Sequence, residues 1–90
     1  MENIAKRIKP ILLKYGVQKA SLFGSYGKGT FDRKSDVDIL FAPPKNMGIQ
    51  YVELKQELED LLQKKVDLVS MNTIDIRLKK SIMLSEQPIL

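Results

Sequence analysis

The sequence predicts an α/β (α+β) fold in which a small mixed β-sheet is flanked by helices. Three observations carry this prediction. Segments with apolar residues at helical spacing alternate with short segments rich in β-branched and aromatic residues. Their alternation along the chain is typical of mixed architectures. The length of 90 residues allows one core of two layers and leaves no room for a second domain.

The first expected element is a helix near the N-terminus. Its apolar residues are Ile4, Ile8, Ile11, Leu12 and Tyr15. Their spacing places them on one helical face. Pro10 lacks the N–H that a helix interior needs, so we expect the helix to kink or restart there, and Gly16 is well placed to end it.

Two strands separated by a glycine-rich turn come next. Val17 to Phe23 has the apolar, β-branched and aromatic residues of a strand, and Val37 to Phe41 predicts a second one. The glycines of Gly24 to Gly29 predict a turn, and residues 30–35 are polar and loop-like. The pair Pro43-Pro44 would end the second strand, because proline cannot donate to a sheet ladder.

The second half of the chain predicts helix, strand and helix. Ile49 to Gln63 has apolar residues on one face and charged residues elsewhere, which indicates an amphipathic helix. Lys65 to Val69 is a short apolar strand with one acid. Asn72 followed by Asp75 resembles an N-cap with an acid at the third position, so a last helix would begin there. The tail from Gln87 to Leu90 would add a short edge strand.

The expected core draws on apolar residues from each of these elements. It consists of Ile8, Leu12, Leu22, Ile39, Leu40, Leu54, Leu58, Leu61, Leu68, Leu78 and Ile82. We expect Tyr26 and Phe31, close to the glycine turn, to be exposed. There they would stack on a nucleotide base or contact a partner, unless they are only partly exposed loop aromatics.

The composition excludes several kinds of chemistry. The chain has no cysteine and no histidine, which excludes thiolate nucleophiles, the Ser-His-Asp triad and zinc sites built from these residues. Catalysis would have to use carboxylates, hydroxyls, amines, backbone groups or a hard metal ion bound by oxygen. The absence of a long apolar run and of a signal-peptide core predicts a cytoplasmic protein without a membrane partner.

Three acidic residues suggest a metal site. Asp36 and Asp38 alternate with Val37 on a strand, so both carboxylates project from the same face. Two close carboxylates raise each other's pKa unless a cation lies between them, and oxygen ligands suit Mg²⁺ or Mn²⁺. Asp67 would meet them if its strand lies beside the strand of Asp38, giving a two-metal site for phosphoryl transfer. Each acid alone would more often be solvated or paired with a lysine.

The glycine turn fits the same chemistry. Gly24 would let the backbone approach a phosphate closely, and the Ser25 hydroxyl and nearby N–H groups can bind phosphate oxygens. A helix beginning at Ser25 would add a favourable field for an anion, and Lys28 could supply positive charge. A glycine turn alone is more often just a turn. The specific feature is Gly24-Ser25, ten intervening residues, Asp36-Val37-Asp38, and a later acid in a short apolar strand.

This joint motif resembles the DNA polymerase β-like nucleotidyltransferase superfamily. More narrowly, it resembles the minimal nucleotidyltransferases (MNT), the antitoxin halves of HEPN/MNT toxin–antitoxin modules. The match consists of Gly24-Ser25, Asp36-Val37-Asp38 and Lys65 to Val69, and the resemblance covers nearly the whole chain. It implies a polymerase β-like fold in which residues 1–90 form a single minimal nucleotidyltransferase domain. The arginines that the group often has just after Gly-Ser are replaced here.

The resemblance also implies a role for each motif residue. Asp36 and Asp38 would hold two Mg²⁺ ions, and Asp67 would complete the metal site and help to activate the attacking hydroxyl. The nucleotide would be bound by Gly24, Ser25 and Lys28. ATP would be the substrate, and its AMP would pass to a hydroxyl of a partner in a hetero-oligomer, a tyrosine of a HEPN RNase toxin.

Two other functions stay open. The chain has no room for the acceptor-binding domains of larger superfamily members, so it could be a non-catalytic or weakly catalytic antitoxin that neutralises the toxin by binding. The first third of the chain is basic and could attract RNA. We rank a nucleic-acid partner last for two reasons. Lysines on the solvated face of a helix are the more common explanation of this charge, and most of the few aromatic residues fit the core.

Overall fold

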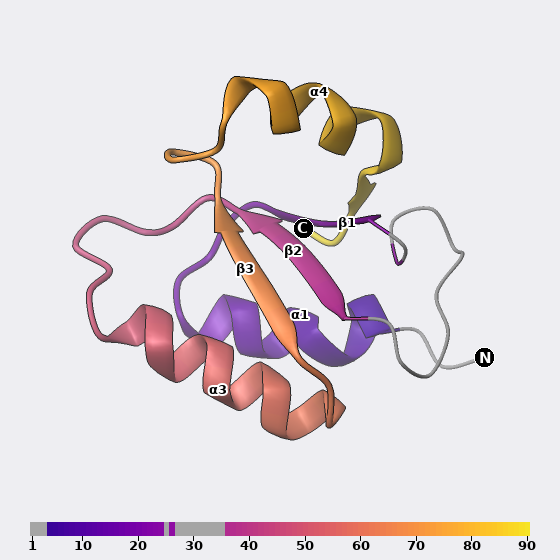
Figure 1. The fold of residues 1–90 in the computed structure, drawn as a ribbon. Coiled ribbons are helices and arrows are strands. Elements are labelled where there is room, and N and C mark those ends of the chain that lie inside the picture. The colour runs from indigo at the N-terminus through magenta and orange to yellow at the C-terminus, as the bar shows by residue number, and fades with distance from the viewer. Residues whose placement is uncertain (1–3, 25, 27–35) are drawn as a thin grey trace.

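The structure is a computed structural model that describes residues 4–24, 26 and 36–90. The elements follow in the order α1 (Ile4–Lys14), β1 (Ala20–Phe23), β2 (Val37–Phe41), α3 (Gln50–Leu62), β3 (Val66–Ser70), α4 (Ile76–Ser85) and β4 (Gln87–Pro88) (Figure 1). The predicted order of helices and strands is confirmed, including the short strand at the C-terminus.

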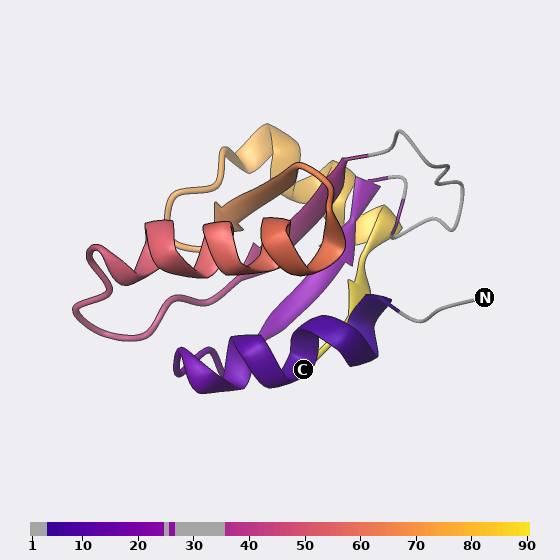
Figure 2. The ribbon, with the colours of Figure 1, turned by 90° about the horizontal axis from the view of Figure 1, so that it is seen from below.

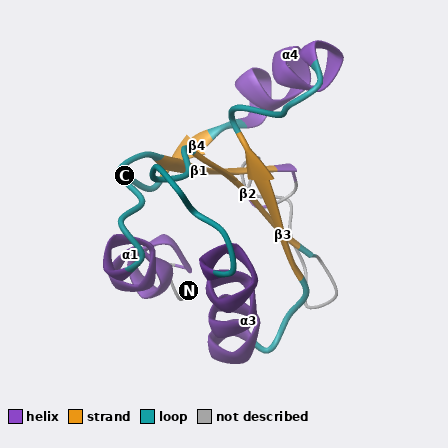
Figure 3. Ribbon diagram, turned by 90° about the vertical axis from the view of Figure 1, so that its left-hand side faces the viewer, coloured by secondary structure: helices purple, strands orange, loops and turns teal. Residues whose placement is uncertain are grey.

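The strands form one mixed sheet in the order β3-β2-β1-β4. β1 is antiparallel to both β2 and β4, whereas β2 and β3 are parallel and are connected through α3. Helices α1 and α3 lie side by side on one face of the sheet (Figure 2). Helix α4 lies on the other side (Figure 3). The predicted α/β (α+β) class is therefore confirmed. One face of the sheet is covered by α1 and α3, and α4 lies on the side of the other face.

The main core lies between the sheet and helices α1 and α3. Its fully buried side chains are Phe41, Ile8, Leu12, Ile39, Leu54, Leu58, Val17, Val37 and Val66. Of the predicted core residues, Leu61 is only partly buried, and the side chain of Leu78 lies outside the described part of the chain. The others are buried as predicted, but Leu40 and Ile82 stand apart from this cluster.

The sequence predicts a kink or a restart of the first helix at Pro10. The helix does not restart there, because α1 continues through Pro10 to Lys14. Proline removes one backbone hydrogen bond, and burial of Ile8 and Leu12 on either side holds the turn in place. Gly16 ends the helix as predicted: its φ is +82°, and the next N–H donates to the Leu12 carbonyl at 3.0 Å.

Two other boundaries also differ. The first strand begins at Ala20 and not at Val17, because Val17 closes the end of α1 and is buried in the core. The cap of α4 is Asp75 and not Asn72: the Asp75 carboxylate accepts a hydrogen bond from the Arg77 N–H at 2.8 Å. An aspartate directly before the first helical turn satisfies a free N–H group there.

Side-chain contacts join the helices to their neighbours. Lys14 Nζ lies 2.7 Å from Glu57 Oε2, and the Tyr15 hydroxyl donates to Glu57 Oε1 at 3.0 Å, which ties the end of α1 to α3. Across the sheet, the buried Ser21 hydroxyl of β1 donates to Glu86 Oε1 at 2.6 Å, just after α4. No helix in the described part of the chain is long and apolar enough to cross a membrane.

Candidate functional site

Two of the predicted acids lie on adjacent parallel strands. Asp38 of β2 and Asp67 of β3 are register partners. Their neighbours Val37 and Val66 are fully buried in the core under α1 and α3. Because side chains alternate along a strand, Asp38 and Asp67 project from the opposite face of the sheet. The parallel pairing that the prediction required is therefore present.

The third acid, Asp36, comes directly before β2. It is exposed, as is Asp67, whereas Asp38 is partly buried. Burial raises the pKa of the Asp38 carboxyl, and the negative charges of Asp67 and then Asp36 raise it further. The charges of Asp67 and Asp36 thus act on the Asp38 carboxyl near the start of β2. Negative carboxylates that lie near one another destabilise the fold unless a cation compensates their charge, and their oxygen atoms suit a hard metal ion.

Gly24 lies against the Asp38 carboxylate. β1 ends at Phe23, the register partner of Asp38, and Gly24 follows with φ +66°. A Cβ atom built on Gly24 would clash with Asp38 Oδ2 and lie 3.4 Å from Asp38 Cγ. Glycine is needed here for two reasons, because a side chain would be strained by the left-handed backbone and would also displace the carboxylate.

The structure leaves the rest of the predicted site undecided. Ser25 and Lys28 lie outside the described residues, and so do Phe31 and the remaining glycines of the turn. Within residues 4–24, 26 and 36–90, no three acidic side chains are arranged so that they could hold one metal ion together. The roles of Asp36, Asp38 and Asp67 as metal ligands therefore stay predictions.

Tyr26 is not exposed, contrary to the prediction. Its side chain is 4% exposed and belongs to the main hydrophobic core. Lys64 Nζ lies 5.8 Å from the centroid of its ring. No sequence pattern predicts this burial, because Tyr26 stands between Ser25 and Gly27 in a segment without helical or strand periodicity.

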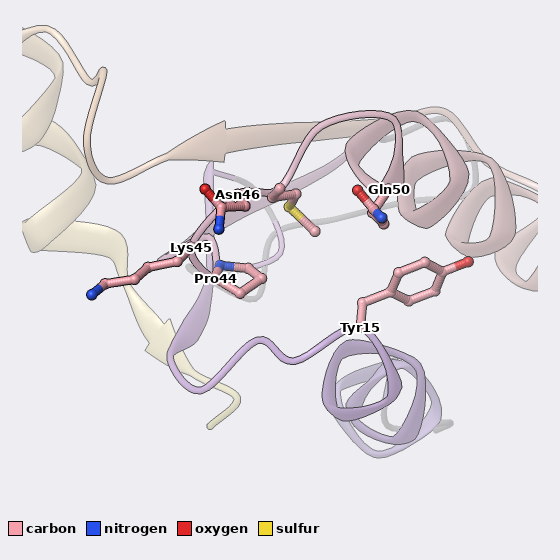
Figure 4. A pocket seen from close by; sticks show the side chains of 6 residues that line it. Tyr15, Pro44, Lys45, Asn46 and Gln50 are labelled. Carbon is pink, nitrogen blue, oxygen red and sulfur yellow. The ribbon is translucent and has the colours of Figure 1, made fainter.

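A pocket of about 240 Å³ lies elsewhere on the molecule, where the chain leaves β2 and enters α3 (Figure 4). It is lined by Tyr15, Pro44, Lys45, Asn46, Met47 and Gln50. These residues adjoin the C-terminal end of β2, whereas Asp38 lies near its N-terminal end. No acidic side chain lines the pocket, so it is separate from the candidate site.

Comparison with known sequences places the chain among nucleotidyltransferases. The family model described as "Polymerase beta, Nucleotidyltransferase" matches residues 6–90. A candidate protein adenylyltransferase of Methanocaldococcus jannaschii is 44% identical over 85 residues, which cover 92% of this chain and 90% of the relative. The protein adenylyltransferase MntA of Thermococcus cleftensis is 34% identical over 77 residues, covering 83% and 77%.

Comparison with solved structures agrees with this placement. A toxin–antitoxin structure with AMP-PNP has a TM-score of 0.83 and 29% identity, covering 96% of this chain and 72% of that one. A toxin–antitoxin MntA–HpeT mutant, with two aspartates two positions apart changed to glutamate, has a TM-score of 0.80 and 29% identity, covering 99% and 73%. The predicted polymerase β-like fold is confirmed. The chain belongs to the polymerase β nucleotidyltransferase family and is a nucleotidyltransferase.

Proposed function

We propose that this protein transfers AMP from ATP to a tyrosine hydroxyl of a HEPN-type RNase toxin and so acts as its antitoxin. The observation that carries the proposal is the register pairing of Asp38 with Asp67 on parallel strands, with the Gly24 backbone against Asp38. Relatives named as protein adenylyltransferases support the AMP transfer. Toxin–antitoxin structures support the partner, and AMP-PNP in one of them supports ATP as the donor.

The proposed reaction replaces a phosphoanhydride bond of ATP with a phosphodiester bond to the tyrosine. The tyrosine oxygen bonds to the α-phosphorus of ATP, the bond from that phosphorus to the bridging oxygen breaks, and pyrophosphate leaves. Asp67, exposed beside Asp38, would take the hydroxyl proton. Residues 1–90 would act as a single domain in a hetero-oligomer, because the acceptor comes from the partner.

Asp36, Asp38 and Asp67 would hold two Mg²⁺ ions. Burial and the charges of Asp67 and Asp36 raise the pKa of Asp38, which supports a bound cation at this carboxylate, and oxygen-only donors fit magnesium. Bound Mg²⁺ would neutralise phosphate charge and orient the α-phosphate. The triphosphate would bind at Gly24, Ser25 and Lys28, where the Gly24 backbone can approach phosphate closely because it has no side chain.

Transfer of label from α-³²P-ATP tests this proposal. The protein is incubated with Mg²⁺ and a purified HEPN-type RNase toxin as the candidate acceptor. Label should appear on the partner, and Asp36→Asn or Asp38→Asn should abolish it. Glu53→Gln, which removes an exposed carboxylate from α3, is the control and should transfer normally. Normal transfer by both aspartate variants would refute the assigned roles.

A growth assay separates catalysis from simple binding. If neutralisation needs AMP transfer, cells that produce the toxin should not be rescued by Asp38→Asn. Rescue by Asp38→Asn at wild-type level, with the complex still formed on purification, would instead establish an antitoxin that acts by covering its partner. Asp36 and Asp67 are exposed, so this surface could contact the toxin as well as take part in the chemistry. Complex formation with the toxin is therefore measured for each aspartate variant.

A further inference from the structure

Tyr26 is the point where the chain that follows β1 enters the core. Its side chain is 4% exposed and lies in the cluster between the sheet and helices α1 and α3. Gly24, two positions earlier, lies against the Asp38 carboxylate. The buried Tyr26 ring therefore holds the chain at a position two residues from Gly24, which the proposed function places beside a phosphate.

The Tyr26 ring also contacts the connection between α3 and β3. Lys64 Nζ lies 5.8 Å from the ring centroid, within the range of a cation–π interaction. Lys64 follows α3, which ends at Leu62, and precedes β3, the strand that carries Asp67. Tyr26, three positions after the last residue of β1, thereby contacts a side chain that comes just before β3.

Several hydrogen bonds define this connection. Gln63 ends α3 in the left-handed conformation with φ 53°, and its N–H donates to the Glu59 carbonyl at 2.8 Å. Gln63 Nε2 donates to the Asp60 carbonyl at 2.7 Å. Glu59 Oε2 accepts from the Val66 N–H at 2.9 Å, which ties the helix to the first residue of β3. These hydrogen bonds order the backbone on both sides of Lys64, whose side chain lies over the Tyr26 ring.

We propose that Tyr26 is a positioning residue for the nucleotide site. Held against the Lys64 connection, its ring keeps Gly24 at the Asp38 carboxylate. The sheet pairs β1 with β2 and β2 with β3. The contact of Tyr26 with Lys64 adds a second link between the chain that follows β1 and the chain that precedes β3. Gly24, Asp38 and Asp67 then keep fixed relative positions, which a bound triphosphate requires. The role in nucleotide binding rests on the proposed function, whereas the anchor itself does not.

The test compares two substitutions at this position. Tyr26→Leu keeps an apolar side chain but removes the ring, and Tyr26→Phe keeps the ring and loses only the hydroxyl. Leu54→Val, a small loss of volume from the same core on α3, controls for weaker packing in general. AMP-PNP affinity in Mg²⁺ is measured by calorimetry, and label transfer gives KM and kcat.

Tyr26→Leu should raise the AMP-PNP Kd and the KM for ATP about tenfold while kcat stays within about twofold. Tyr26→Phe and Leu54→Val should bind AMP-PNP like the wild type. Unchanged affinity in Tyr26→Leu would overturn the proposal, and so would an equal loss of affinity in Leu54→Val, because the effect would then follow core packing alone.

Hydrogen exchange of the Gly24 amide without nucleotide tests the anchor separately. Exchange should be faster in Tyr26→Leu than in the wild type and unchanged in Tyr26→Phe, at equal global stability. Equal exchange in all three proteins would overturn the anchor. If the wild type itself did not bind AMP-PNP, the proposed function would fail, whereas the exchange result would still decide whether Tyr26 fixes Gly24.

Discussion

Asp38 occupies a position that costs stability. It is partly buried, and its pKa is raised first by burial and then by Asp67 and Asp36. A raised pKa means that the folded protein disfavours the charged form. The charge therefore lowers stability once the pH rises above the ordinary range of a carboxyl, and this loss is complete above the raised pKa. In the proposed function, a bound cation would compensate this charge.

Removing this charge should therefore stabilise the fold. Asp38→Asn should raise the Tm at neutral pH by a few degrees, measured by calorimetry without metal. Mg²⁺ should raise the Tm of the wild type and have much less effect on the variant, because bound metal stabilises the folded state. Asp60→Asn, at an exposed position of α3, should show no change in its response to metal. A less stable Asp38→Asn would contradict this account.

Gly24 should be intolerant of a side chain. Gly24→Ala places a methyl group in a left-handed backbone and against Asp38. The backbone term alone is about 1–2 kcal/mol, and the displaced carboxylate should reduce label transfer. Gly48→Ala is the matched control, because a Cβ at Gly48 meets nothing within 4 Å. Urea unfolding and label transfer measure both effects, and equal behaviour of the two variants would exclude the close contact.

At the scale of elements, Lys14, Tyr15 and Glu57 join helices α1 and α3. The hydrogen bond to Lys14 lowers the pKa of Glu57, and the bond to Glu57 raises the pKa of Lys14. Both groups are exposed, so the contribution is small and screened by salt. Its role is to fix how the two helices lie beside each other under the sheet.

The sign of each shift gives the pH dependence of this junction. A lowered carboxyl pKa stabilises the fold at neutral pH, and this contribution is lost as the pH falls through the folded pKa of Glu57. The raised Lys14 pKa contributes below the ordinary lysine range and is lost at strongly alkaline pH. Glu57→Gln should therefore lose less stability than the wild type between neutral and strongly acidic pH, measured by urea unfolding. Glu53→Gln should retain the wild-type slope.

At the scale of the whole molecule, the single layer of apolar side chains between the sheet and helices α1 and α3 supports the site. Leu58 is fully buried in it. Leu58→Ala should cost about 2–5 kcal/mol, a large part of the stability of a small domain. Circular dichroism and urea unfolding measure this loss. If Leu58→Ala remained as stable as the wild type, the assigned core would be wrong; if it unfolds, loss of label transfer says nothing about chemistry.

The sequence by itself determined the kinds and order of the elements, and it pointed to the three acids for which we propose a role in the chemistry. Helical and strand periodicities, the glycine after α1 and the Gly-Ser and Asp-x-Asp spacing are local, so they can be recognised without the fold. The sequence predicts the boundaries of the elements less accurately than their kinds, as Pro10 and Val17 show, because burial of neighbouring residues overrides local preference.

Only the tertiary structure decided how these pieces meet. Parallel pairing sets Asp38 opposite Asp67, and antiparallel pairing brings Gly24 onto the Asp38 carboxylate. Tyr26 is buried in the core, and Lys64 of the α3–β3 connection, far away in sequence, lies over its ring. No local pattern encodes such contacts, since they depend on strand order and register, which the packing of the whole chain selects.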